Sequence, residues 1–290
     1  MGKGETFLND FQGKVAVITG AASGIGRALA FRFAKEGMRL VLADIEEINL
    51  DATAKELQAT GVEVLSVKVN VAKPAEVETL ANRALNRFGS IDILCNNAGV
   101  GAKPRATWEY TQSDWEWVFG ANFWSVVNGL HTFVPIMIRQ GTEGHIVNTA
   151  AMSGLVGLPN FAPYVASKHA VVAITESLHY ELGFRKTKLK ASVLCPGYVT
   201  TRIAEGARPA AEDLRDATLE VQLMEEAKAR AQTALPPEAV AESVLDGIRK
   251  EKFYILTHPE RKADFAWRAA NIMEERNPDP QALLNGWLGN

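Results

Sequence analysis

Residues 15–26 read Val-Ala-Val-Ile-Thr-Gly-Ala-Ala-Ser-Gly-Ile-Gly, and this stretch decides the fold. It starts as an apolar run rich in β-branched residues, which is typical of a buried strand. Three glycines close the stretch, and Arg27–Glu36 then has the pattern of a helix that ends at Gly37. This order suits a dinucleotide, because glycines let the backbone approach a pyrophosphate and the helix N-terminus meets its negative charge. The spacing is Gly-x-x-x-Gly-x-Gly, and a purely structural glycine turn is the alternative.

A carboxylate follows the next strand pattern. Residues 39–43 are mostly apolar and end at Asp44, eighteen residues after Gly26. A carboxylate there can accept hydrogen bonds from both ribose hydroxyls of an adenosine, and it repels a 2′-phosphate. Ile45 comes next, so no adjacent cation offsets the repulsion. The sequence therefore predicts NAD rather than NADP, unless Asp44 only caps the following helix.

Strand and helix patterns continue to alternate along the chain. The predicted strands cover residues 14–19, 39–43, 62–69, 91–95, 146–148, 189–194 and 253–256, and the predicted helices cover 27–36, 45–60, 74–88, 113–140, 164–182 and 237–249. Ser113–Glu116 has the pattern of a capping box, and Pro135 is expected to kink or shorten that helix. The alternation predicts an α/β fold with a doubly wound parallel sheet, helices on both faces and ligands beyond the carboxyl ends of the strands.

Tyr164 and Lys168 form the candidate chemical centre. They stand four residues apart and therefore share one face of the predicted helix. An ammonium beside a phenol favours the phenolate and lowers the phenol pKa from about 10. The pair then provides a proton-transfer group that works near neutral pH. Taken alone, it also fits a half-buried tyrosine beside a solvated lysine.

The composition excludes several classes of protein. The chain has 290 residues, 47% hydrophobic content and a net charge of −3, so no basic field favours nucleic acid or a membrane surface. The first ten residues do not resemble a signal peptide, and no run approaches the ~18 apolar residues of a membrane span. Cys95 and Cys195 both end strand patterns. We expect buried thiols in a reducing cytoplasm, without a disulfide or a metal.

In combination, these motifs resemble the short-chain dehydrogenase/reductase family over roughly residues 12–256. The motifs that carry the resemblance are the glycine turn Thr19–Gly26, Asn96–Gly99, Asn122, Tyr164 with Lys168, and Pro196 with Gly197. The resemblance implies a single Rossmann-type domain over residues 1–258 with about seven parallel strands. It implies hydride transfer between NAD(P) and a carbonyl or alcohol. It also implies a homodimer or homotetramer built on the two long helices that carry Asn122 and Tyr164.

The resemblance further implies a role for each matching residue. Tyr164 exchanges a proton with the substrate oxygen, Lys168 lowers its pKa and holds the nicotinamide ribose, and Asn122 fixes a water behind Lys168. The implied cofactor residues are Gly20, Ser23, Gly24, Ile25 and Gly26 at the pyrophosphate turn, Asp44 at the adenine ribose, Asn70 and Val71 at the adenine, Asn97 and Ala98 at the adenosine side, and Val199 and Thr201 at the carboxamide. The hydride chemistry belongs to the cofactor, which the protein orients and polarises.

One position departs from the family. The family has a serine thirteen residues before the tyrosine, whose hydroxyl bonds the substrate oxygen as charge develops, and here that residue is Ala151. We expect strongly reduced activity, and an engineered inactivating Ser-to-Ala change is the favoured interpretation. A natural, weakly active enzyme is one alternative, and substitution by the hydroxyl of Thr149 or Ser153 is another. A non-catalytic NAD-binding sensor or scaffold is the last, although it would not need Asn122, Tyr164 and Lys168 together.

Apolar residues near the site indicate the substrate. The apolar candidates are Met152, Leu155, Val156, Leu158, Phe161, Tyr198 and Ile203, and the polar Ser153 is a further candidate substrate residue. If they line the pocket instead of packing in the core, they favour a bulky, largely apolar or aromatic secondary alcohol or its ketone over a sugar. Residues of about 200–235 suggest a helical lid over the site. Residues 259–290 suggest a charged helical tail whose Trp267 and Trp287 pack on the core or on a partner subunit.

Overall fold

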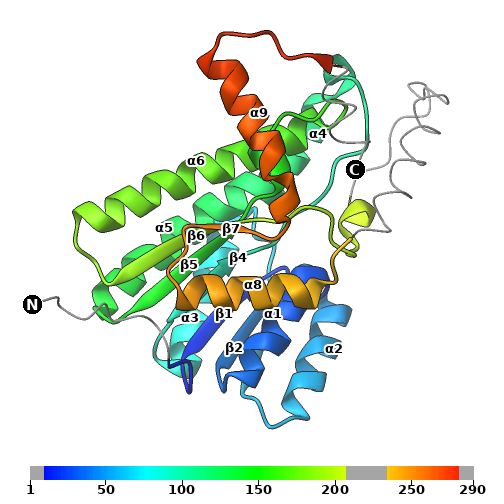
Figure 1. The fold of residues 1–290 in the computed structure, drawn as a ribbon. Coiled ribbons are helices and arrows are strands. Elements are labelled where there is room, and N and C mark those ends of the chain that lie inside the picture. The colour runs from blue at the N-terminus through cyan, green and yellow to red at the C-terminus, as the bar shows by residue number, and fades with distance from the viewer. Residues whose placement is uncertain (1–9, 207–233, 281–290) are drawn as a thin grey trace, which may run out of the picture.

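The apolar run at the start of the chain forms β1 (Val15–Thr19), and all five of its residues are buried. It pairs in parallel with strands on both sides, which explains why its residues are apolar throughout. The computed structural model describes residues 10–206 and 234–280, and its sheet has seven strands in the order β3-β2-β1-β4-β5-β6-β7 (Figure 1). The other strands are β2 (Arg39–Asp44), β3 (Val64–Lys68), β4 (Ile93–Asn96), β5 (Gly144–Thr149), β6 (Leu189–Cys195) and β7 (Tyr254–Leu256). All neighbours pair in parallel, so the predicted sheet is confirmed.

Helices cover both faces of this sheet. Successive residues of a strand point to opposite faces, and Ala16 and Ile18 lie in one core while Val15 and Val17 lie in another. The first core contains residues of α1 (Gly24–Lys35), α2 (Glu47–Gln58) and α8 (Pro237–Arg249), and the second contains residues of α3 (Pro74–Phe88), α5 (Ser125–Gln140) and α6 (Ala162–Phe184) (Figure 1). The doubly wound, three-layer arrangement predicted from the alternation of elements is therefore confirmed.

The direction of winding reverses beside β1. From β1 the chain builds outward through β2 to β3, and it then returns through α3 to β4 on the other side of β1. The loops after β1 and β4 therefore leave the sheet in opposite directions. In open parallel sheets the crevice between two such loops is the place where ligands bind. The glycine turn and the Asn96–Gly99 motif both stand at this crevice.

The helix that carries Asn122 differs from the prediction. Its capping box is formed by Thr111 and Asp114, not by Ser113 and Glu116, because the Thr111 hydroxyl accepts from the Asp114 amide at 3.3 Å and the Asp114 carboxylate accepts from the Thr111 amide at 3.0 Å. The helix comprises α4 (Gln112–Phe119), a π-helical turn η2 (Gly120–Trp124) and α5. Asn122 lies in that turn, and such turns inside α-helices often occur at functional sites.

Pro135 does not shorten α5, which continues to Gln140. The proline lacks the amide that would bond the carbonyl of His131. His131 is exposed, so water can bond this carbonyl instead. The helix therefore tolerates the proline at its surface.

Several further expectations concern the ends of the chain. Most of the predicted lid, residues 207–233, and Trp287 lie outside the described residues. The predicted C-terminal tail is helical in its described part, with η6 (Pro259–Arg261) and α9 (Lys262–Met273), and Trp267 is half-buried there. Cys95 and Cys195 are both buried free thiols, as predicted. Among the described residues, no helix is long and apolar enough to span a membrane, and no cluster of side chains could hold a metal ion.

The contact between α5 and β4 generates a prediction about stability. A Cβ on Gly129 would lie 2.2 Å from the Asn96 Oδ1 atom, and the Asn96 amide donates to Asn148 at 2.9 Å inside the core. Gly129→Ala should therefore break a buried hydrogen bond and reduce the free energy of unfolding by about 1–3 kcal/mol. Gly183→Ala is the matched control, since nothing lies within 4 Å of its added Cβ, and it should stabilise α6 by up to about 1 kcal/mol. Urea unfolding measures both, and equal effects would contradict the argument.

Candidate active site

The ends of β1 and β4 are held together by one hydroxyl. The Thr19 Oγ1 atom accepts from the amides of Asn97 at 2.9 Å and Ala98 at 3.1 Å, and it donates to the Cys95 carbonyl at 3.3 Å. Gly20 follows with a φ of +69°, and a Cβ there would lie 2.9 Å from the Cα of Ala98. Only glycine allows the two loops to approach so closely.

The glycine turn leads directly into α1. A Cβ on Gly26 would lie 2.0 Å from the Gly20 carbonyl oxygen, and Gly24 has a φ of +52°. Ser23 is the N-cap of α1 without using its side chain as a cap, and no acidic residue occupies the first turn. The hydroxyl and the first amides of this helix remain suited to an anion.

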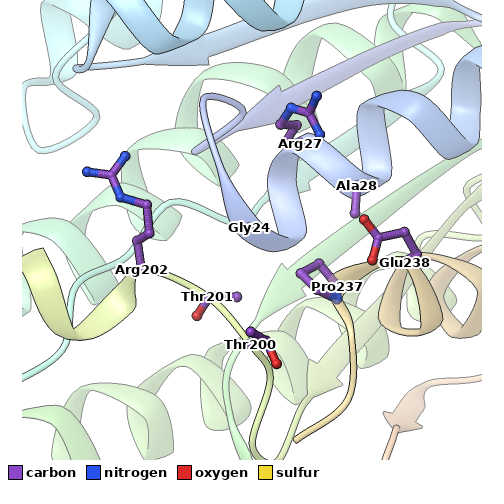
Figure 2. A pocket seen from close by; sticks show the side chains of 8 residues that line it. All are labelled: Gly24, Arg27, Ala28, Thr200, Thr201, Arg202, Pro237 and Glu238. Carbon is purple, nitrogen blue, oxygen red and sulfur yellow. The ribbon is translucent and has the colours of Figure 1, made fainter.

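A cavity of about 290 Å³ opens at this helix N-terminus. Figure 2 shows α1 on one side, the segment that follows β6 on another and the start of α8 on a third; the lining residues are Gly24, Arg27, Ala28, Thr200, Thr201, Arg202, Pro237 and Glu238. Arg27 and Arg202 bring positive charge, although Glu56 and Glu205 each lie 2.6 Å from one of them. The conformation of the turn, the helix N-terminus and the cations fit the pyrophosphate of a dinucleotide.

Asp44 stands at the end of β2, beside the glycine turn. Its Oδ2 atom accepts from the Ala22 amide and its Oδ1 atom accepts from the Glu46 amide, both at 3.0 Å. The carboxylate is thereby oriented, and Ile45 beside it is 54% exposed. This arrangement suits the ribose of an adenosine.

The residues predicted to face the adenine, Asn70 and Val71, also stabilise the loop in which they lie. The side-chain Oδ1 atom of Asn70 accepts from the backbone amide of Ala72 at 3.1 Å. The backbone amide of Asn70 donates to the Glu76 carboxylate at 2.7 Å. The Val71 carbonyl accepts from Asn128 at 3.0 Å. The loop after β3 is therefore fixed in shape before any ligand binds.

Lys168 is deeply buried beside Tyr164. Its side chain is 2% exposed, its Nζ atom donates to the Thr149 carbonyl at 3.0 Å, and the same atom lies 5.6 Å from the centroid of the Tyr164 ring. Burial lowers the pKa of Lys168 from 10.5 to about 8. The predicted solvated lysine is therefore excluded as an alternative, because the ammonium is inside the protein.

Asn122 lies next to this ammonium. Its Oδ1 atom accepts from the Val100 amide at 2.7 Å, and its Nδ2 atom donates to the Val100 carbonyl and to Ser167, each at 3.1 Å. A Cβ on Gly99 would lie 2.9 Å from the Asn122 Oδ1 atom and 3.4 Å from the Lys168 Nζ atom. Gly99 thus leaves the space in which Asn122 and Lys168 come together.

The expected low pKa of Tyr164 is wrong for this state of the protein. Burial raises the pKa of the Tyr164 phenol, Tyr198 raises it further, and a hydrogen bond from the Ser153 hydroxyl lowers it only in part. Lys168 does not reverse the shift, since its ammonium bonds the Thr149 carbonyl instead of the phenol oxygen. The sequence reveals the pairing of the two side chains but not the cost of burying both.

Position 151 carries no hydroxyl, and its neighbours differ in what they contact. Ala151 is buried at the start of the turn η3 (Met152–Gly154), which is tied to the loop after β6 by a 2.8 Å bond from the Met152 amide to the Pro196 carbonyl. The Thr149 hydroxyl donates to the Asn97 Oδ1 atom at 3.4 Å. Ser153 is buried and bonds Tyr164. Of the two candidate substitutes, the structure brings only Ser153 to the phenol.

The predicted substrate residues fall into two groups. Met152 and Val156 are buried, and Met152 belongs with Leu155 to a core cluster between α6 and β6. Packing in the core therefore accounts for the apolar character of these residues. The others reach the surface, with Leu158 and Phe161 half-buried, Tyr198 37% exposed and Ile203 42% exposed. The Gly101 amide donates to the Ile203 carbonyl at 3.1 Å, which links the loop after β4 to the residues that lead toward position 207.

The sequence analysis did not identify His258, which the structure places at the site. Its ring contacts the loop after β6, with 3.0 Å between its Nδ1 atom and the Gly197 amide and 3.1 Å between its Nε2 atom and the Tyr198 carbonyl. In the same loop, Val199 pairs with Leu235, and the Thr201 methyl would meet a Cβ on Gly24 at 3.0 Å. The sequence shows a histidine just after the last predicted strand, but no pattern in the sequence indicates that it contacts Gly197.

Proteins of one known family are similar to this chain in sequence and in fold. The family described as short chain dehydrogenase matches residues 14–212. A short chain dehydrogenase/reductase from Burkholderia phymatum, solved in complex with NAD, is 43% identical, with a TM-score of 0.86 over 94% of this chain and 99% of that chain. The CLA biosynthesis dehydrogenase/reductase of Lactiplantibacillus plantarum is 37% identical over 94% of this chain and 97% of its own length. The 1-deoxy-11-beta-hydroxypentalenate dehydrogenase of Streptomyces exfoliatus is 35% identical over 93% and 96%.

This chain therefore belongs to the short-chain dehydrogenase/reductase family of oxidoreductases. Its relatives are named as dehydrogenases and reductases, and a nicotinamide cofactor fits the glycine turn and the site described above.

The buried ammonium generates a prediction about stability and pH. The folded-state pKa of Lys168 lies below its ordinary value, so the penalty for burying the charge is fully present below pH 8 and fades between pH 8 and 10.5. In the absence of added cofactor, Lys168→Met should remove a penalty of roughly 3 kcal/mol, partly offset by the lost bond to Thr149. We expect a higher melting temperature than that of the wild type at pH 7, a smaller difference near pH 10, and no turnover. Lys55→Met, on the exposed face of α2, should change none of these; a less stable Lys168→Met protein at pH 7 would refute the argument.

Proposed function

We propose that this chain is an NAD-dependent oxidoreductase that transfers hydride between NAD(H) and a bulky, largely apolar or aromatic secondary alcohol or its ketone. The observation that carries the proposal is the cluster of buried Asn122 and Lys168 with half-buried Tyr164 next to the glycine turn. A related protein solved with NAD and a relative named for a hydroxylated pentalenate support the cofactor and the alcohol. The half-buried Phe161 and the exposed Tyr198 and Ile203 favour an apolar substrate over a sugar only in part, because Met152 packs in the core.

Each residue of the cluster has a distinct role in this proposal. Bound NAD supplies the hydride acceptor. The Tyr164 phenolate takes the proton of the alcohol oxygen, and the phenol returns it in the opposite direction. The Lys168 ammonium is held by the Thr149 carbonyl and favours the phenolate by its charge. Asn122 fixes the Val100 loop beside Lys168 and thereby keeps that side of the site in place.

We propose that this form is slow, because Ala151 cannot bond the substrate oxygen where negative charge builds. The Ser153 hydroxyl bonds the phenol, so it stabilises Tyr164 rather than the oxygen that reacts. The missing hydroxyl is also the observation that favours a second function, a non-catalytic NAD-binding sensor or scaffold. A substrate panel of alicyclic and aromatic secondary alcohols, with sugars as the negative set, separates the two functions: NAD binding without any turnover would favour the sensor.

The protein is also proposed to form a homodimer or homotetramer through its long helices. Trp124 on η2 and Tyr180 and Phe184 on α6 are large side chains that are more than half exposed in the single chain. Apolar surface of this kind is often covered by a second subunit.

Asp44 generates the prediction on cofactor choice. Since its carboxylate is fixed beside the turn and no cation follows it, a 2′-phosphate would be repelled. We expect calorimetry to give tighter binding of NAD than of NADP, and Asp44→Ala to reduce that preference. Asp51→Ala on the exposed side of α2 serves as the control for the loss of one carboxylate. Equal or tighter binding of NADP by the unaltered chain would rule out the NAD assignment.

Ala151 generates the prediction on rate. A serine at this position should restore a donor for the developing charge, and one such donor typically changes the rate by about 10²–10³. Ala151→Ser should therefore raise the rate of single-turnover hydride transfer by at least tenfold, with NAD affinity unchanged because position 151 is remote from the adenosine site. Ser153→Ala, made in both backgrounds, is the control. A gain below threefold together with a large loss in Ser153→Ala would mean that Ser153 already does this work, and no activity in any variant would mean that the chain is not a dehydrogenase.

A further inference from the structure

His258 connects the last strand to the loop that follows β6. Strands β6 and β7 pair in parallel with Cys195 opposite Leu256. Gly197 and His258 each stand two residues beyond this pair, so the sheet register itself brings them side by side. His258 is 7% exposed, and its surroundings are therefore set by the protein.

The contacts of the imidazole fix its protonation state. The Gly197 amide donates to the Nδ1 atom at 3.0 Å, and the Thr257 hydroxyl lies 2.7 Å from the same atom. Nδ1 must therefore be an acceptor without a proton. The Nε2 atom lies 3.1 Å from the Tyr198 carbonyl, which can only accept, so Nε2 carries the proton. All three contacts are satisfied by one neutral tautomer and by no other state of the ring.

The ring also packs against the backbone that it bonds. A Cβ on Gly197 would lie 2.7 Å from the Cγ atom of His258, so residue 197 must be glycine for the ring to fit. The Tyr198 carbonyl accepts a second bond, from the Leu235 amide at 2.9 Å, and the Thr200 amide donates to the Leu235 carbonyl at 3.0 Å. The segment Gly197–Thr201 is thus fixed from one side by His258 and from the other by Leu235.

We propose that neutral His258 is a positioning residue, which holds the segment Gly197–Thr201 in the shape that the nicotinamide end of the cofactor requires, and that protonation of its ring releases this segment. The inference rests on the proposed NAD-dependent function, because Val199 and Thr201 in this segment are the residues expected to meet the carboxamide. Thr201 also adjoins Gly24 of the glycine turn, so a displaced segment would disturb both ends of the crevice.

The direction of the pH effect follows from the contacts. A second proton on Nδ1 would point at the Gly197 amide hydrogen and end that bond, whereas the Thr257 hydroxyl could rotate and accept from the new N–H. Burial lowers the pKa of His258, Glu260 and the hydrogen bond to the Tyr198 carbonyl raise it in part, and Arg261 lowers it, so the pKa lies below its ordinary value. The other titratable side chains nearby are Cys195 at the end of β6 and Tyr198 in the loop that follows. The pKa of Cys195 is raised by burial to about 12, so that thiol stays neutral. NAD binding favours the neutral ring, so affinity should fall as the pH drops through the pKa of His258, which lies below its ordinary value of 6.5.

The test compares two substitutions of His258 with one control. His258→Ala removes every contact of the ring, whereas the Oδ1 atom of His258→Asn can still accept from the Gly197 amide but cannot titrate. His131→Asn, on the exposed side of α5, removes a histidine elsewhere. NAD affinity is measured by calorimetry between pH 5 and 7.5, KM for NAD and kcat are measured where there is turnover, and backbone hydrogen exchange is followed in residues 196–201.

We expect His258→Ala to weaken NAD binding roughly tenfold at pH 7.5, since the two hydrogen bonds from the ring to the segment are lost. KM for NAD should rise more than kcat falls, and residues 196–201 should exchange faster. His258→Asn should bind NAD within about threefold of the wild type at pH 7.5 and should lose the decline toward pH 5, which His131→Asn keeps. If wild type and His258→Ala bind NAD equally and exchange equally, the inference is wrong while the proposed function stands. If the wild type binds no NAD at pH 7.5, the proposed function falls and the inference falls with it.

Discussion

The close approach of two loops at the end of β1 is the constraint on which the rest of the structure depends. The Thr19 hydroxyl accepts from two amides of the loop after β4, and Gly20 and Gly26 leave no room for a side chain between the turn, that loop and α1. A side chain at either glycine would separate β1 from β4 at the point where the winding reverses. The adjoining ends of β1 and β4 would then no longer form the base of the crevice, and the N-terminus of α1 would no longer face it. The same contacts that close the fold thus create the place where an anionic cofactor can lie.

Burial then determines the chemistry of the groups placed there. Lys168 and Tyr164 are each driven toward their neutral forms, since removal from water disfavours both the ammonium and the phenolate. The Lys168 Nζ atom lies 5.6 Å from the centroid of the Tyr164 ring, and opposite charges this close favour each other. An additional positive charge or a hydrogen-bond donor near the phenol therefore lowers the pKa of Tyr164 and favours the phenolate. Ser153 is one such donor, and it comes from the turn η3 that packs on α6.

The sequence was sufficient for those features that depend on local pattern. Apolar runs of the right length predicted the seven strands, and the glycine spacing, Asp44 and the Tyr164–Lys168 pair predicted where the site lies. Features that depend on several distant residues were missed. The capping box begins at Thr111 because its partner Asp114 outcompetes the equally plausible Ser113–Glu116 pair, and the π-turn around Asn122 leaves no mark in hydrophobic spacing. The raised pKa of Tyr164 depends on burial from several elements, and the role of His258 depends on the register of β6 with β7.

The energetics of the site bear on whether this chain is an enzyme or a binding module. A module that only binds NAD needs the glycine turn, Asp44 and the loop after β6, all of which are satisfied by backbone contacts at little cost. Lys168 is different, because its buried ammonium destabilises the fold below pH 8. Asn122 is likewise specialised, since it lies in a π-helical turn and its side-chain amide donates to the Val100 carbonyl and to Ser167. Both features are useful where a proton must leave the substrate. Their presence together therefore argues for chemistry and not for binding alone.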